Sequence, residues 1–267
     1  MAHRLFEEAR HAANYLRFRP TYPPELVKAI VSYCKKHGCS KQTAVDVGCG
    51  SGQSTTLIAK EYECTVGVDV SQEQIRQAIT AQSESSFESV SYVVAEAECL
   101  PVDSSSVDLV TCSQAYHWLD WDRFHAEMKR VLRSPGCLAV YGYGLPQPQD
   151  VRARQLMTEL YGGTLKGYWD ERRHFVDDCY KSFRLPFKHF ERDDSMNIST
   201  HTTIGHYVGY ISTWSGYQSY RKQHPDDDPL EEFKEKLINV MTPAECENPL
   251  DTPMYTIAPL FLLLGIN

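Results

Sequence analysis

Residues Val45–Gln53 read Val-Asp-Val-Gly-Cys-Gly-Ser-Gly-Gln, and this stretch decides the fold. The apolar run Thr43–Val47 predicts a strand, the three alternating glycines predict a turn, and the residues from Gln53 onwards predict a helix. A strand, a glycine-rich turn and a helix place free backbone N–H groups and the positive end of a helix beside a ligand. We therefore expect a ligand-binding turn; the alternative is a turn that only links a strand to a helix.

The spacing of the glycines separates two kinds of cofactor. A dinucleotide-binding turn has the spacing G-x-G-x-x-G, which suits a pyrophosphate. Here the third glycine comes one residue earlier, so the turn reads Asp46-x-Gly48-x-Gly50-x-Gly52. An acidic residue before G-x-G-x-G resembles motif I of the class I methyltransferases, which use S-adenosylmethionine (SAM). SAM has no phosphate but has an amino-acid end, whose ammonium an acidic residue and backbone carbonyls can hold.

A second acidic residue follows at the distance expected for a ribose contact. Cys64–Val70 has the pattern of a buried strand and ends in Asp69-Val70. An acidic residue there, roughly 20 residues after the glycines, is placed to bind two ribose hydroxyls. Asp69 can instead be a turn or cap residue, but Ser71 is the better N-cap, because Ser71-x-x-Gln74 has capping-box spacing.

Strand and helix patterns alternate from about residue 43 to residue 143. The expected strands are Thr43–Val47, Thr65–Val68, Val90–Val94, Val107–Cys112 and Cys137–Tyr143, and the expected helices are Ser54–Glu61, Gln72–Ser83 and Trp121–Leu132. This alternation predicts an α/β fold with a doubly wound, mostly parallel, seven-stranded Rossmann-like sheet. Ligands of such sheets lie beyond the carboxyl ends of the strands, where the glycine turn, Asp69, Glu96 and Gln114 all fall.

The pattern changes after Leu145, where Pro146 and Pro148 mark a break. Beyond it we expect helices over Val151–Tyr161, Thr202–His224 and Leu230–Val240, and strands over Phe187–Ile198 and Met254–Ile266. The interpretation is one domain over residues 1–267, with an N-terminal helical cap over 1–40, a SAM-binding core over 41–145, and an α-helical substrate cap with terminal strands over 146–267.

Composition limits the partners. The 27 Lys and Arg against 35 Asp and Glu give a net charge of −8, which argues against a nucleic-acid substrate. The nine cysteines include no C-x-x-C pair, which favours reduced thiols in the cytoplasm over disulfides or a zinc site. The longest apolar run, Leu260–Ile266, is far shorter than the roughly 20 residues of a membrane helix. We expect a cytoplasmic protein, monomeric or weakly dimeric, with neither a metal nor a membrane partner.

Further segments resemble one methyltransferase branch, the trans-aconitate methyltransferase-like proteins (methyltransferase type 11). They are Ala95–Pro101, similar to "D-A-x-x-L-P"; Val107–Val110, similar to the fourth-strand motif; Gln114–Asp120, similar to "Q-A-x-H-W"; and Tyr15-x-x-x-Arg19-Pro20-x-Tyr22-Pro23, similar to "Y-x-x-x-R-P-x-Y-P". The resemblance covers nearly the whole chain, but folds of this kind change substrate by changing loops.

The resemblance implies a role for each matched residue. The backbone of Gly48 and Gly50 is expected to hold the methionine end of SAM, Asp46 its ammonium, Asp69 the ribose, Glu96 and the N–H of Ala97 the adenine, and Gln114 the methyl-donor side. The wider pattern favours Asp where this chain has Glu96. The full expected cofactor set is Tyr15, Arg19, Asp46, Gly48, Gly50, Gly52, Gln53, Asp69, Val70, Glu96, Ala97, Gln114 and Ala115. The product cofactor is S-adenosylhomocysteine.

The acceptor side is less well marked. Its candidates are Tyr22, His117, Tyr168, Trp169 and Arg172. His117 can act as a base or substrate contact, or it can fix its loop by hydrogen bonds, and the second role is preferred. Arg19 can bind an acceptor carboxylate, hold the methionine carboxylate of SAM, or form a surface ion pair. Tyr168 and Trp169 can form a lid wall or pack in a core.

We expect a SAM-dependent methyltransferase with a small-molecule acceptor, a carboxylic acid among the candidates. Methyl transfer is an in-line displacement, so positioning and water exclusion dominate. A carboxylate acceptor needs no base, whereas an amine, phenol or thiol must lose a proton, which would make His117 important. The alternatives are an interaction protein that has kept the SAM fold and lost its chemistry, and an NAD-dependent oxidoreductase, which the glycine spacing disfavours.

Overall fold

The computed structural model describes residues 17–83 and 89–267. At its centre is a sheet that has nine strands among these residues, in the order β3-β2-β1-β4-β5-β9-β6, with β7 and β8 also paired to β9. The strands are β1 Thr43–Val47, β2 Cys64–Asp69, β3 Val90–Val94, β4 Val107–Ser113, β5 Leu132–Tyr143, β6 Gln147–Pro148, β7 Lys188–Asp193, β8 Asn197–Thr203 and β9 Pro253–Ile266. The first five are parallel and β9 is antiparallel to β5. The doubly wound Rossmann-like fold is confirmed.

The sheet has two strands more than expected because β9 is long. Its second half pairs with β5 and β7, and its first half pairs with β8 and the short β6. The single strand expected over Phe187–Ile198 is therefore two strands, each paired with a different half of β9. The apolar run Leu260–Ile266 is part of β9, as expected. In the described part of the chain, no helix combines the length and apolar character that crossing a membrane requires.

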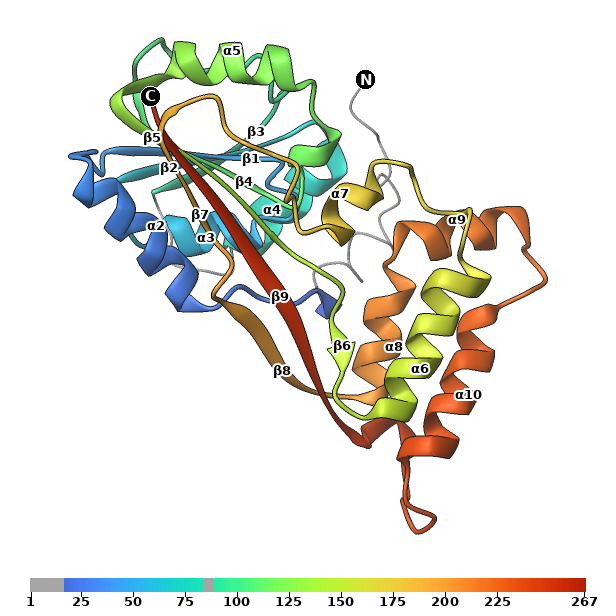
Figure 1. The fold of residues 1–267 in the computed structure, drawn as a ribbon. Helices are drawn as coiled ribbons and strands as arrows, with labels where there is room; N and C mark the ends of the chain where they lie inside the picture. The colour runs from blue at the N-terminus through green and yellow to red at the C-terminus, as the bar shows by residue number, and fades with distance from the viewer. Residues whose placement is uncertain (1–16, 84–88) are drawn as a thin grey trace.

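Helices cover the sheet in layers. They are α2 Pro24–Lys36, α3 Gln53–Ile58, α4 Gln72–Ser83 and α5 Trp121–Val131. Figure 1 shows α5 on one side of the sheet and α2 and α3 on the other. The predicted cap of α4 is confirmed, because the backbone N–H of Gln74 donates to the Ser71 hydroxyl at 3.3 Å.

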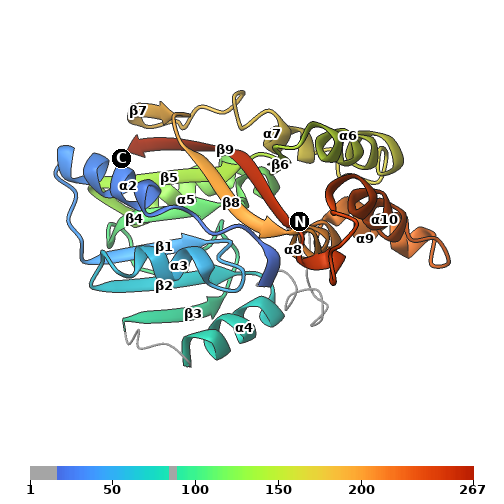
Figure 2. The same ribbon diagram turned by 90° about the horizontal axis from the view of Figure 1, so that it is seen from below.

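Most of the remaining helices form a cap beside the sheet. They are α6 Val151–Glu159, the π-helix η2 Leu160–Thr164, α7 Arg173–Asp177, α8 Ile204–Ser212, α9 Ser215–Gln223 and α10 Pro229–Met241. Two short 3-10 helices, η1 Tyr116–Trp118 and η3 Pro249–Asp251, follow β4 and α10. Figure 2 shows β8 and β9 running from the sheet to α8. The helix expected over Thr202–His224 is two helices, because Trp214 is extended and begins α9. Four aromatic side chains of these two helices and their junction, Tyr207, Tyr210, Trp214 and Tyr217, are buried.

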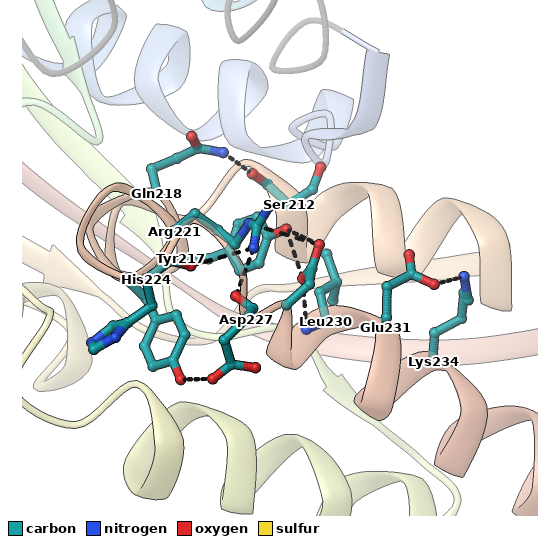
Figure 3. A network of polar contacts seen from close by, with 11 residues as sticks. Ser212, Tyr217, Gln218, Arg221, His224, Asp227, Leu230, Glu231 and Lys234 are labelled. Carbon is teal, nitrogen blue, oxygen red and sulfur yellow. Dashed lines mark hydrogen bonds and ion pairs between the residues drawn. The ribbon is translucent and has the colours of Figure 1, made fainter.

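The acidic turn between α9 and α10 is part of the cap's structure. Asp228 accepts the backbone N–H of Leu230 at 3.1 Å and the hydroxyl of Tyr217 at 3.0 Å. Arg221 donates to the carbonyl of Asp227 at 2.6 Å, as Figure 3 shows. These acidic residues therefore begin a helix and hold two helices together.

Candidate cofactor site

The glycine turn follows β1 and has a left-handed backbone at all three glycines. Their φ angles are 64° at Gly48, 54° at Gly50 and 84° at Gly52. A Cβ on Gly48 would lie 2.5 Å from the Cβ of Ala115, and a Cβ on Gly52 would overlap the hydroxyl of Tyr92. A Cβ on Gly50 would meet only the side-chain oxygen of Gln74, at 3.7 Å. Close packing therefore requires the outer glycines, whereas the space in front of the middle one admits a ligand.

Asp46 lies beneath the turn and has no exposed surface. Its two carboxylate oxygens accept the hydroxyls of Thr55 and Thr111, each at 2.7 Å. Burial raises the pKa of this carboxyl to about 6. Asp46 thus links β1 to α3 and β4 through these two hydrogen bonds. Its expected contact with an ammonium stays a prediction.

Asp69 ends β2 and joins the two cofactor loops. One carboxylate oxygen accepts the backbone N–H of Gly50 at 2.9 Å and the other accepts that of Ser71 at 2.9 Å. Burial raises the pKa of this carboxyl above its usual value. Each carboxylate oxygen has a second lone pair, so Asp69 can still accept the hydroxyls of a ribose. The sequence did not reveal the link from Asp69 to Gly50.

The loop after β4 faces the turn from the other side. Gln114 has a left-handed backbone with φ 54°, and its side-chain amide donates to the carbonyl of Tyr143 at 2.7 Å. Beyond β3, Ala97 is buried, while the Glu96 side chain is 63% exposed and pairs with Arg123 at 3.6 Å. Glu96 is therefore accessible to an adenine, although it already has a cationic partner.

Two cavities lie along the carboxyl ends of the strands. The first, of about 280 Å³, is lined by Arg19, Pro20, Thr21, Tyr22, Gly48, Cys49, Gly50, Ser51, Gln53, Ser54, Thr56, Leu57, Ser113, Gln114 and Tyr143. The second, of about 460 Å³, is lined by Glu96, Glu98, Trp118, Leu119, Asp120, Trp121, Asp122, Arg123 and Arg172. The first cavity brings together six residues expected from the sequence: Arg19, Tyr22, Gly48, Gly50, Gln53 and Gln114. Tyr15 lies outside the described residues.

Arg19 and Tyr22 connect the cap to the sheet across the first cavity. The Arg19 guanidinium donates to the carbonyl of Thr213 at 3.1 Å and lies 5.3 Å from the centre of the Tyr210 ring. The Tyr22 hydroxyl accepts that of Ser113 at 2.8 Å. Sequence reasoning missed Ser113 and Tyr143 as lining residues, because nothing in their local pattern indicates that this N-terminal segment folds over them.

The structure places the other acceptor candidates away from the first cavity. His117 is 4% exposed, and its ring Nδ1 lies 2.5 Å from the hydroxyl of Tyr180. Burial and then the charges of Arg173 and Arg172 lower the pKa of His117 to about 3. These contacts favour the loop-fixing role of His117 over a base.

Tyr168, Trp169 and Arg172 also have structural partners. The Tyr168 hydroxyl lies 2.7 Å from the His224 ring, and Trp169 packs against Tyr161 in the cap. Of the two alternatives, core packing is what the structure shows for Trp169. Arg172 lines the second cavity and donates to the carbonyl of Trp118 at 2.7 Å.

Known proteins resemble this chain in sequence and in fold. Residues 45–140 match the family described as "Methyltransferase domain". A protein of Dictyostelium discoideum named as a methyltransferase is 33% identical over 249 residues, which cover 91% of this chain and 90% of that protein. The chain belongs to the class I SAM-dependent methyltransferases. A Saccharomyces cerevisiae protein named as a SAM-dependent methyltransferase is 22% identical over 80% of this methyltransferase and 82% of its own length.

Solved structures agree with this placement. A protein from Anaeromyxobacter dehalogenans, described as a type II methyltransferase, superimposes on this methyltransferase with a TM-score of 0.75 at 31% identity, covering 93% of this chain and 98% of that one. Phosphoethanolamine N-methyltransferase 2 of Haemonchus contortus, in complex with S-adenosylhomocysteine, shares the fold with a TM-score of 0.50 at 16% identity, over 97% of this chain and 58% of that one. SAM is thus the cofactor; the comparisons support the class and not the trans-aconitate branch.

Proposed function

We propose that this methyltransferase transfers the methyl group of SAM to a small-molecule carboxylate that binds against Arg19. The observation that carries the proposal is that Arg19 and the glycine turn line the same cavity of about 280 Å³. A guanidinium group binds a carboxylate by two parallel hydrogen bonds. Arg19 therefore supplies a recognition element beside the place where the motif I turn holds the cofactor.

The same residues support the assignment of the cofactor. SAM supplies a methyl group on a sulfonium, which is a good leaving group. Asp69 is expected to accept the ribose hydroxyls, and the open space before Gly50 suits the methionine end. We assign the adenine to Glu96 and Ala97, with Val70, Gly52, Gln53 and Ala115 completing the walls.

The residues that line the first cavity favour an acceptor that is already ionised. Among the described lining residues, the titratable side chains are Arg19, Tyr22, Cys49 and Tyr143. Arginine stays protonated, and burial raises the pKa of the Cys49 thiol well above its usual value. His117 does not line this cavity and has Tyr180 as its partner. A carboxylate needs no base, so these residues suffice for it, whereas an amine or phenol would lack a proton acceptor.

A small acceptor also suits the size of the cavity and the net charge of the protein. The cavity of about 280 Å³ lies at the lower limit of small-ligand sites, and the net charge of −8 disfavours a nucleic acid. A cytoplasmic location and a monomer or weak dimer stay predictions. An interaction protein without turnover is the alternative function, and formation of S-adenosylhomocysteine with any acceptor would exclude it.

Arg19→Ala tests the proposal. We expect the KM of a carboxylic-acid acceptor, found by measuring S-adenosylhomocysteine formation over a panel of small acids and their amides, to rise at least about tenfold, because a bidentate charged contact is lost. SAM affinity should stay within a few-fold. Arg17→Ala is the matched control, since Arg17 is an exposed arginine that lies over Phe18 and does not line the cavity.

Two outcomes would contradict the proposal. If the amides were methylated as readily as the acids, the acceptor group would not be a carboxylate. A large loss of SAM affinity in Arg19→Ala, measured without acceptor, would instead assign Arg19 to the methionine carboxylate of the cofactor.

A further inference from the structure

The loop Gln114–Leu119, between β4 and α5, is strained and lies against the glycine turn. Gln114 has φ 54°, a left-handed conformation that is costly for a residue other than glycine and persists only when its surroundings hold it. The next residue, Ala115, occupies the space where a Cβ on Gly48 would lie, at 2.5 Å. A small displacement of this loop would therefore change the cofactor turn.

Two side chains from a distant segment hold this loop. The Tyr180 hydroxyl accepts the backbone N–H of His117 at 3.3 Å and lies 2.5 Å from its ring Nδ1. Arg172 donates to the carbonyl of Trp118 at 2.7 Å and to that of His117 at 3.4 Å. Both come from the segment Arg172–Tyr180, which includes α7 and follows the strand–helix core in the sequence. These bonds add to those within the loop, where the backbone N–H groups of Trp118 and Leu119 donate to the carbonyls of Ala115 and Tyr116 at 2.9 Å and 3.3 Å.

Tyr180 is itself fixed to the sheet. Its side chain has no exposed surface, and its ring lies 4.7 Å from that of Phe261 in β9. Arg192 in β7 donates to the carbonyl of Cys179 at 2.6 Å and to that of Tyr180 at 3.0 Å. Contacts thus connect β7 to Tyr180, and Tyr180 to His117 in the loop whose Ala115 faces Gly48.

We propose that Tyr180 and Arg172 are positioning residues for SAM: they hold the loop Gln114–Leu119 so that Gln114 and Ala115 meet the glycine turn. His117 is then the residue of the loop to which Tyr180 is hydrogen-bonded, and this role is called its anchor role. The proposal rests on the methyltransferase class alone and does not depend on the acceptor.

The Tyr180 hydroxyl accepts the backbone N–H of His117 and lies beside its ring Nδ1. In the tautomer that suits the proposal, the hydroxyl donates its proton to Nδ1 and the neutral ring carries its own proton on Nε2. Burial and the charges of Arg173 and Arg172 lower the pKa of His117 to about 3, so the ring is neutral at physiological pH. The contact with Tyr180 therefore does not change over that pH range.

Tyr180→Phe is the first test, because it removes the hydroxyl and keeps the ring. We expect the Kd for SAM, measured calorimetrically without acceptor, to rise about fivefold to tenfold, the value of one to two hydrogen bonds. Arg172→Gln should shift it in the same direction. The control is Tyr207→Phe, whose buried hydroxyl donates to the carbonyl of Pro146 at 3.1 Å in the cap, so both variants lose a buried hydroxyl bond. A Kd for Tyr180→Phe within twofold of that of the control would overturn the proposal.

His117 supplies a second test that separates an anchor from a base. Asparagine keeps an acceptor near the position of Nδ1, whereas leucine does not. We expect His117→Asn to keep SAM affinity and turnover within about threefold, and His117→Leu to lose SAM affinity as Tyr180→Phe does. Normal SAM binding by both variants would overturn the proposal, as would normal binding with lost turnover in His117→Asn, which would make His117 a base.

Discussion

Gly48→Ala tests how closely the glycine turn packs against the loop after β4. The new Cβ would lie 2.5 Å from the Cβ of Ala115, although carbon atoms attract each other best at about 3.5–4.0 Å. Relieving this overlap should cost about 1–3 kcal/mol, and the left-handed backbone at φ 64° should cost about 1–2 kcal/mol more. We therefore expect unfolding free energy to fall by about 2–5 kcal/mol.

Ala115→Gly tests the overlap itself, because it removes the Cβ atom of Ala115 that the new Cβ at position 48 would meet. In a double-mutant cycle measured by urea denaturation, Ala115→Gly should recover about 1–3 kcal/mol of the loss in Gly48→Ala, and the backbone cost should remain. SAM affinity should fall in Gly48→Ala and recover in part in the double variant. Gly163→Ala is the control, since a Cβ there meets nothing within 4 Å. A coupling within about 0.5 kcal/mol of zero would refute the packing argument.

The other predictions concern the two acidic residues beside the turn. Asp69→Ala should raise the Kd for SAM at least about 100-fold, since hydrogen bonds to a carboxylate contribute about 1.5–3 kcal/mol each and the ribose would lose two; an unchanged calorimetric Kd would remove the ribose assignment. Asp46→Asn should alter the pH dependence of stability. Burial raises the Asp46 pKa from 3.8 to about 6, so between these values the folded state binds a proton that the unfolded state releases, and stability falls as pH rises. The unfolding free energy of the wild type relative to Asp46→Asn should decrease from about pH 4 to pH 6. A difference independent of pH would show that the Asp46 pKa is the same in the folded and unfolded states.

Much of the core could be predicted from the sequence because each of its elements has a strong local pattern. The strands Thr43–Val47 and Val90–Val94 and the helix Gln72–Ser83 have the expected bounds. Their apolar periods, glycines and caps are local properties that tertiary contacts did not override. The cofactor turn was predictable for the same reason.

What the sequence did not reveal depends on contacts between distant residues. The two halves of β9 pair with different strands, which the apolar run alone does not indicate. The helix pattern over Thr202–His224 continues through Trp214, yet that residue is extended, and its ring packs against Tyr161 and Trp169 in the cap core. The bonds from Asp69 to Gly50 and from Tyr180 to His117 join residues 19 and 63 positions apart. Neither bond has a local sequence pattern, so neither could be predicted from the sequence.

A crystal structure of the protein with S-adenosylhomocysteine is the decisive test of the assigned cofactor site. We expect the ribose hydroxyls within hydrogen-bond distance of the Asp69 carboxylate, the homocysteine end in front of Gly48 and Gly50, and the adenine beside Glu96 and Ala97. The first cavity should then continue from the sulfur toward Arg19. S-adenosylhomocysteine bound instead between Trp118 and Trp121, with the glycine turn left empty, would contradict the assignment of the cofactor site.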